Sequence, residues 1–222
     1  MAQGNSFFKY LEDGVSFTSE QALDYRRIYM PLCGPDASSL KSAITPFFAG
    51  DSKIDKFSYL TKPTSTEDLR TNGRDFFVSV NGQIVSLAQK ADQQKLTAGQ
   101  LWHQVERTYT DAGVTLKALN FVPISAPKTE LMKIEVRNDS DKDITITPTS
   151  GIPLFARSLA NKHDHEHVTS LLHRTRQIDC GVIVHPPMAF NEEGHKANDL
   201  NYYVIGSVVA VVVSSEAETE SR

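Results

Sequence analysis

The residues whose types and spacing best suit chemistry lie between His163 and His167, which read His-Asp-His-Glu-His. On a β-strand, alternate side chains share a face, so His163, His165 and His167 could together bind Zn²⁺. On a helix, only His163 and His167 would share a face. A loop ordered by hydrogen bonds is the alternative that we favour, because short motifs often match by chance. We predict no metal and no cofactor, and keep a His-cluster metal-binding protein as an alternative.

Four carboxylates near this run could contribute to glycoside chemistry, which needs two such groups at a defined separation. They are Asp164, Glu166, Glu192 and Glu193. The sequence sets no distance between them, and most such groups are solvated or paired with arginine. The sequence also contains neither a Gly-x-Ser-x-Gly turn nor a phosphate-binding glycine loop. We therefore predict no catalytic residue in this chain.

Composition and charge exclude two classes of partner. The 222 residues carry a net charge of −4, with 23 Lys and Arg against 27 Asp and Glu. This is not the electrostatic pattern of a nucleic-acid-binding protein. The longest apolar stretch, 204–213, is about half of the ~20 residues that a membrane helix needs. With only two cysteines and no signal-peptide pattern, we expect a cytoplasmic protein that contacts neither nucleic acid nor membrane.

Alternating apolar and polar residues dominate the first 150 positions and predict the elements that must position any site. Asn81-Gly82 separates two β-prone runs and predicts a hairpin with a type I′ turn. Further hairpins are expected where 101–110 returns as 114–122 and where 131–137 returns as 144–147, and weaker strands at 25–32, 42–48 and 57–60. Regular short strands predict an all-β fold, a large antiparallel β-sandwich.

The composition changes after Pro153. Residues 154–178 are dense in His, Arg and Asp. We expect one or two short helices, the clearest over 168–173, and strands at 181–185 and 202–205. The acidic end, 214–222, is expected to be disordered.

The aromatic residues allow another class of function. With 11 Phe, 7 Tyr and a single Trp, most are expected to fill the sandwich core. Trp102, Tyr202 and Tyr203 are left open, because aromatic rings on one sheet face could stack on sugars. A stand-alone carbohydrate-binding module is therefore a further alternative.

A longer, composite motif extends through the region dense in His and Arg. It reads Ile152-Pro-Leu-Phe-Ala-Arg-Ser-Leu-Ala-Asn-Lys-His-Asp-His-Glu-His-Val-Thr-Ser-Leu-Leu-His-Arg174, then Gly181-Val-Ile-Val184 and Phe190-Asn-Glu-Glu-Gly-His195. This order resembles the N-terminal domain of cellobiose-phosphorylase-like proteins, which form glycoside hydrolase family 94, formerly glycosyltransferase family 36. The resemblance covers 152–206 well, and 28–32 and 42–46 more loosely.

The resemblance implies a galactose-mutarotase-like super-sandwich over 1–206, which in the family precedes a linker and an (α/α)₆ catalytic barrel. The family carries out inverting phosphorolysis of β-linked oligosaccharides, with inorganic phosphate as co-substrate, and the full-length proteins form homodimers. The catalytic Asp lies in the barrel, so we expect this chain alone to be inactive. Residues 207–222 read as an atypical apolar strand and acidic tail, and we expect a truncated or split reading frame.

The same resemblance suggests where a docking or substrate-shaping surface would lie. Glu166 and Glu193 stand where the family pattern has arginine, so no anion site is expected there. The interface or substrate-site candidates are Arg157, Ser158, Asn161, Asp164, His165, His167, Arg174, Glu192 and His195. We expect Arg157, Asp164 and Arg174 to form charge-assisted pairs that fix a loop against a neighbouring domain.

Overall fold

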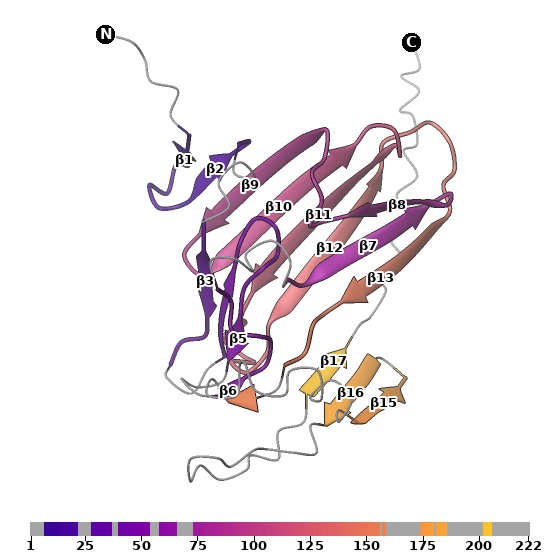
Figure 1. Ribbon diagram of the computed structural model, residues 1–222. Helices are drawn as coiled ribbons and strands as arrows, with labels where there is room; N and C mark the ends of the chain where they lie inside the picture. Colours follow the sequence, from indigo (N-terminus) through magenta and orange to yellow (C-terminus); the bar gives the residue numbers. More distant parts are fainter. Residues whose placement is uncertain are drawn as a thin grey trace, which may run out of the picture. The chain divides into compact units, whose positions relative to one another are not determined.

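Figure 1 shows the computed structural model, which describes residues 7–21, 28–36, 40–53, 58–65, 73–155, 157–158, 174–179, 181–185 and 202–205. All regular structure in these residues is β-strand, arranged in four antiparallel sheets. This confirms the all-β prediction and is consistent with a β-sandwich. The helix expected over 168–173 lies outside the described residues. The chain forms two compact units, Met1–Ser170 and Leu171–Arg222.

The largest sheet of the first unit has six strands. Their order is β1 (Lys9–Tyr10), β2 (Phe17–Ser19), β9 (Gln93–Gly99), β10 (Trp102–Tyr109), β11 (Val114–Phe121) and β12 (Leu131–Asn138). The β10–β11 hairpin turns at Gly113, whose φ of 66° suits glycine. Burial alternates along most of β10 and β11, as the sequence pattern predicted, although Val114, Thr115 and Leu116 at the start of β11 are all buried.

The core lies on the inner face of this sheet. Leu96, Val105 and Leu116, on three neighbouring strands, are at most 2 % exposed. They belong to one apolar cluster with Val78 and Val85 of a three-stranded sheet ordered β13 (Ile146–Gly151), β7 (Asp75–Val80) and β8 (Gln83–Ser86). That sheet lies in front of the long strands in Figure 1. The two sheets therefore form a sandwich with the apolar cluster between them.

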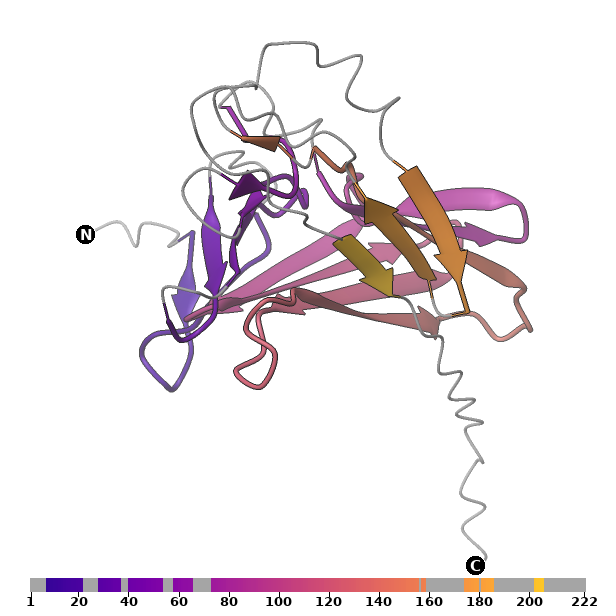
Figure 2. The same cartoon turned by 90° about the horizontal axis from the view of Figure 1, so that it is seen from below.

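A five-stranded sheet completes the first unit. It runs β14 (Arg157–Ser158), β6 (Ser58–Tyr59), β5 (Ser52–Lys53), β4 (Lys41–Ile44) and β3 (Met30–Cys33). Leu32, Ile44 and Phe48 from this region join the same core cluster. Figure 2 shows β3 and β4 crossing the direction of the long strands steeply. The strand expected over 42–48 ends at Ile44, because the chain turns there and Phe48 takes a φ of 62°.

The Asn81-Gly82 hairpin is confirmed, but the third predicted hairpin is wrong. Asn81 and Gly82 both have positive φ, 48° and 90°, as a type I′ turn requires. However, β12 pairs with β11, whereas β13 pairs with β7 in the other sheet. Thr145 explains why the chain passes from the six-stranded sheet to the three-stranded sheet after β12. Its backbone N–H donates to Asn81 Oδ1 at 3.1 Å, and its carbonyl accepts from the Asn81 N–H at 3.1 Å.

The second unit contains a three-stranded antiparallel sheet. Its order is β15 (Arg174–Ile178), β16 (Gly181–His185) and β17 (Tyr202–Ile205). The strands predicted at 181–185 and 202–205 are confirmed. β15 was not predicted, because its first four residues are all exposed and polar and offer no apolar alternation.

Candidate functional site

The composite motif begins at one edge of the five-stranded sheet. Backbone pairing aligns Arg157 with Tyr59 and Ser158 with Ser58, so β14 adds to β6 as the edge strand. Just before it, the Phe155 N–H donates to the Leu60 carbonyl at 2.8 Å. The first two candidate residues are thus held by backbone hydrogen bonds to a sheet of the first unit.

Arg174 lies in the other unit, at the start of β15. It pairs with His185 of β16 and is exposed. The remaining candidates lie outside the described residues, and so do the members of the proposed His cluster: Asn161, His163, Asp164, His165, His167, Glu192 and His195. The charge-assisted pairing expected of Arg157, Asp164 and Arg174 therefore stays a prediction.

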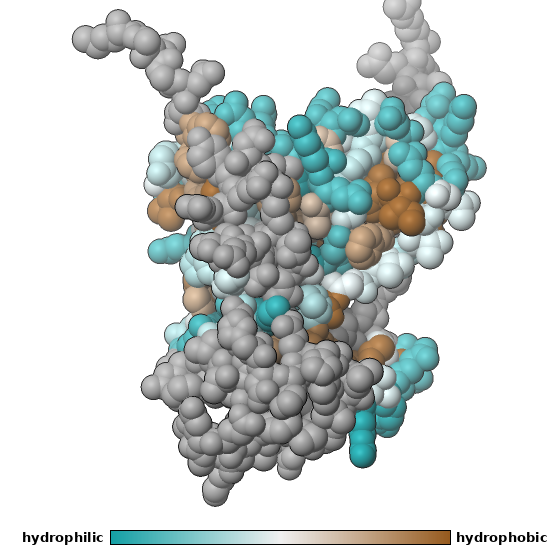
Figure 3. Space-filling model, viewed as in Figure 1, coloured by the Kyte–Doolittle hydropathy of each residue, from teal (hydrophilic) through white to brown (hydrophobic). Residues whose placement is uncertain are grey.

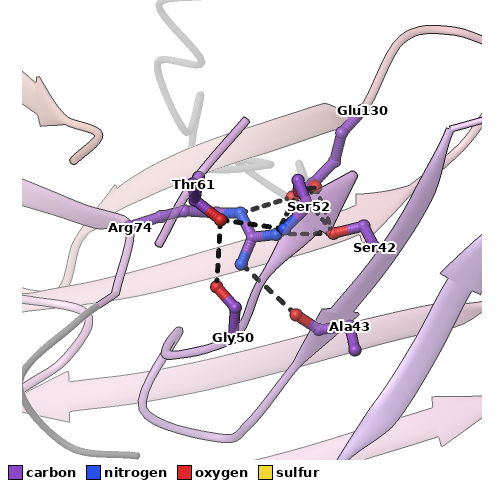
Figure 4. Close-up of polar contacts among 7 residues, drawn as sticks. All are labelled: Ser42, Ala43, Gly50, Ser52, Thr61, Arg74 and Glu130. Atoms are coloured by element: carbon purple, nitrogen blue, oxygen red, sulfur yellow. Dashed lines mark hydrogen bonds and ion pairs between the residues drawn. The ribbon is translucent and has the colours of Figure 1, made fainter. Parts of the chain in front are cut away.

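The most extensively hydrogen-bonded ion pair among the described residues joins Arg74, just before β7, to Glu130, just before β12 (Figure 4). Arg74 Nε lies 2.8 Å from Glu130 Oε1, and Nη2 donates to Oε2 at 2.9 Å. The side chains are 4 % and 12 % exposed. Such two-point geometry is the strong form of an arginine–carboxylate pair.

Two serine hydroxyls complete this cluster. Arg74 Nη2 lies 2.5 Å from Ser42 Oγ and 2.9 Å from Ser52 Oγ, and both hydroxyls donate to Glu130 Oε2, at 2.5 and 3.0 Å. The serines sit on adjacent strands, β4 and β5. Thr61 extends the network, since its Oγ1 accepts from the Ser52 N–H at 2.8 Å.

This geometry suits the Glu130 carboxylate poorly to acid–base chemistry, because it is only 12 % exposed and both of its oxygens already contact Arg74. Oε2 accepts from Arg74, Ser42 and Ser52, while Oε1 faces the guanidinium. A general base must reach the proton that it removes with an available lone pair. We therefore interpret the cluster as a cross-link between the sheets rather than a catalytic centre. Sequence reasoning missed it because its members are far apart in the chain and no local pattern marks them.

A second set of buried polar groups lies on the inner face of the six-stranded sheet. His103 and Asn120 are aligned across β10 and β11, and both are fully buried. Within the described part of the chain, neither ring nitrogen of His103 nor either amide atom of Asn120 has a hydrogen-bond partner. The imidazole meets the Phe48 ring edge-on, with centroids 5.7 Å apart. Burial, with smaller contributions from the charges of Arg107 and Arg74, lowers the pKa of His103 to about 3.

Arg107 points inward from the same strand. Its guanidinium donates to the backbone carbonyls of Leu87 and Pro46 and, at 3.4 Å, to Gln94 Oε1. Burial lowers the pKa of Arg107 to about 10, so the side chain is still charged at neutral pH. His103 is neutral there, which keeps two positive charges from sharing one face of the core.

Cys33 and Trp102 also have defined places in the structure. Cys33 is a half-buried free thiol at the end of β3. Trp102 is half-buried at the start of β10. Among the described residues, no three His, Cys, Asp or Glu side chains lie close enough together to hold a metal ion.

Two further findings bear on function. In the described residues, no helix has the length and apolar character needed to cross a bilayer. No protein-family model matches the sequence, and no curated protein matches it as a relative.

Proposed function

We propose that this chain is the carbohydrate-associated N-terminal β-sandwich domain of a cellobiose-phosphorylase-like glycoside phosphorylase. The composite motif between Ile152 and His195 carries the proposal, because it is long and its parts occur in the family's order. The all-β antiparallel architecture agrees with the fold that the motif implies. In this proposal the chain works in the cytoplasm, as part of a homodimer.

The domain would act by docking and by shaping the substrate site. In the family, the catalytic Asp and the groups that bind inorganic phosphate lie in the (α/α)₆ barrel, so these 222 residues would supply neither. The described candidates for contact with the barrel are Arg157 and Ser158 at the sheet edge and the exposed Arg174. A surface rich in charged and hydrogen-bonding groups suits an interface between domains better than a core does.

A reconstitution experiment tests this proposal. The purified chain is mixed with the separately expressed (α/α)₆ barrel domain of a cellobiose phosphorylase, and binding is measured by calorimetry. Sugar 1-phosphate is assayed with cellobiose and inorganic phosphate. We expect no turnover by the chain alone, and a complex with the barrel. Turnover by the chain alone, or the absence of any complex, would contradict the proposal.

A matched pair of charge reversals locates the contact. Arg174→Glu is expected to weaken binding to the barrel about tenfold, because it reverses an exposed charge in the motif. Lys90→Glu makes the same change at an exposed position in the first unit, outside the motif, and should leave binding unchanged. Equal effects of the two variants would mean that only net charge matters.

A further inference from the structure

The outer face of the six-stranded sheet is apolar at one end. Backbone register aligns Trp102 of β10 with Phe121 of β11, and Phe121 with Leu131 of β12. All three point away from the core, since their neighbours on the inner face include His103. Trp102 and Phe121 are half-buried and Leu131 is 42 % exposed. We call these three side chains the Trp102 row.

The indole of Trp102 is held in place by a glycine. Gly99 of β9 is aligned with Trp102, and a Cβ added to it would lie only 2.3 Å from Trp102 Nε1. Ser16 Oγ would lie 2.5 Å from the same added Cβ. The indole therefore occupies the space that any other side chain at position 99 would fill, which fixes the ring against the sheet before a ligand arrives.

A hydrogen-bonded carboxylate lies beside this end of the row. Asp13 Oδ1 accepts from the backbone N–H groups of Val15 and Ser16, at 3.0 and 2.8 Å, and Oδ2 accepts from Ser16 Oγ at 2.6 Å. Hydrogen bonds from Ser16 and Val15 lower the pKa of Asp13, so the group is ionised at neutral pH. It is exposed and retains lone pairs that a hydroxyl could reach.

The charges on the rest of the outer face are arranged with opposite signs adjacent. Register places Lys95, Glu106, Lys117 and Glu135 in one row across four strands. Lys117 Nζ lies 3.6 Å from Glu135 Oε2, and the nearer Lys133 donates to Glu135 Oε1 at 2.6 Å. This row of alternating charges therefore offers a strongly charged ligand no patch of a single opposite sign.

We propose that the Trp102 row is a binding surface for a neutral β-linked gluco-oligosaccharide. A sugar ring has an apolar face of C–H groups that suits an aromatic ring, while its hydroxyls need donors and acceptors at the rim. Gln104 and Asp13 provide these at two sides of the row.

The size of the row favours a sugar over a protein partner. It crosses three strands, about 10 Å at the usual strand spacing of about 4.8 Å. That is enough for a short oligosaccharide, whereas a standard protein interface takes about 20–30 residues from each partner. Only the choice of a β-linked glucan as the ligand rests on the proposed function. The assignment of the Trp102 row as a sugar-binding surface rests on the contacts described above.

The single Trp of the chain makes the test direct, because tryptophan emission, excited selectively over that of the tyrosines, reports on Trp102 alone. Cellotetraose and laminaritetraose are titrated into the full chain, with calorimetry in parallel. We expect a saturable change in emission with at least one of them. No change in either measurement at millimolar sugar would overturn the proposal.

Three variants place the site. Phe121→Ala should weaken binding about five- to tenfold by removing one ring of the row. Phe77→Ala removes a ring that is 37 % exposed on the three-stranded sheet and should change nothing. Gly99→Ala should displace the indole, and so alter the emission of the free protein as well as weaken binding. Circular dichroism verifies that each variant folds.

The outcomes separate this inference from the proposed function. Barrel docking without sugar binding removes only the inference, whereas sugar binding without barrel docking leaves a stand-alone carbohydrate-binding module. Sugar binding that survives Phe121→Ala would refute the Trp102 row as its location. A dimer in sedimentation that Phe121→Ala dissociates would assign the row to a second copy of the chain and overturn the inference.

Discussion

Replacing the buried His103 with leucine should change how the stability of this protein depends on pH. The imidazole is fully buried, and its pKa falls from the ordinary 6.5 to about 3 in the folded state. In the unfolded chain the ring takes up a proton near pH 6.5, so between these values the unfolded state binds more protons. Acid therefore favours unfolding, and stability rises with pH across this window. Above pH 6.5 the effect is absent.

The size of the effect follows from the two pKa values. Each pH unit below 6.5 lowers the free energy of unfolding by about 1.4 kcal/mol. This one side chain therefore lowers it by about 3 kcal/mol at pH 4 and by about 4 to 5 kcal/mol at pH 3. Typical domains are stable by only about 5–15 kcal/mol, so such a loss is measurable by urea unfolding. Trp102 fluorescence provides the signal.

Comparing the variant with the wild type isolates His103 from the other titrating groups. As the pH falls from 7 to 4, the wild type should lose about 3 kcal/mol more of its free energy of unfolding than His103→Leu does. Asn120→Leu is the matched control, because it changes the aligned residue without removing a titrating group. Its curve should run parallel to that of the wild type. A His103→Leu curve that also runs parallel would refute the assignment of a neutral, unprotonated His103.

Three other expectations concern stability, each measured by urea unfolding. Asn120→Leu should stabilise the protein at pH 7 by about 1 kcal/mol or more, because it removes a buried amide that has no partner in the described part of the chain; a loss above 1 kcal/mol would indicate that the amide is satisfied. Arg74→Met should lower the free energy of unfolding by about 3–5 kcal/mol, because it leaves the Glu130 carboxylate without its arginine. The double variant Arg74→Met with Glu130→Leu should lose less than Arg74→Met alone, because it leaves no uncompensated charge. Gly50→Ala should prevent folding or cost more than about 3 kcal/mol, because its Cβ would lie 2.0 Å from the Ala43 carbonyl oxygen, whereas Gly82→Ala, with open space around it, should cost only about 1 kcal/mol.

The sequence was most informative where a single local rule decides the structure. The Asn81-Gly82 turn and the β10–β11 hairpin were predicted because turn chemistry and alternation act over a few residues. The partner of β13 was not, because both β12 and β7 are compatible with its residues. The choice depends on Asn81, which lies 64 positions from Thr145 and is brought beside it only by the fold.

The candidate sites differ in the same way. The composite motif could be read directly from consecutive residues, but its chemistry depends on what the motif contacts. The Arg74–Glu130 cluster draws on residues from position 42 to position 130, and no spacing rule connects them. The Trp102 row can be predicted in part, since the sequence alone allows Trp102 as a sugar contact. Phe121 and Leu131 join it only once the strand register is known.

Register also links the charged row to the Trp102 row. Each exposed pair, such as Lys117 with Glu135, contributes at most about 1 kcal/mol, because water screens it. Their value lies in specificity: a two-residue slip of β12 along β11 would remove Glu135 from its position opposite Lys117 and separate Leu131 from Phe121. The same slip would bring Lys133 or Arg137 opposite Lys117, which places like charges together. Charge pairing thus favours one register, and that register assembles the surface that we propose binds sugar.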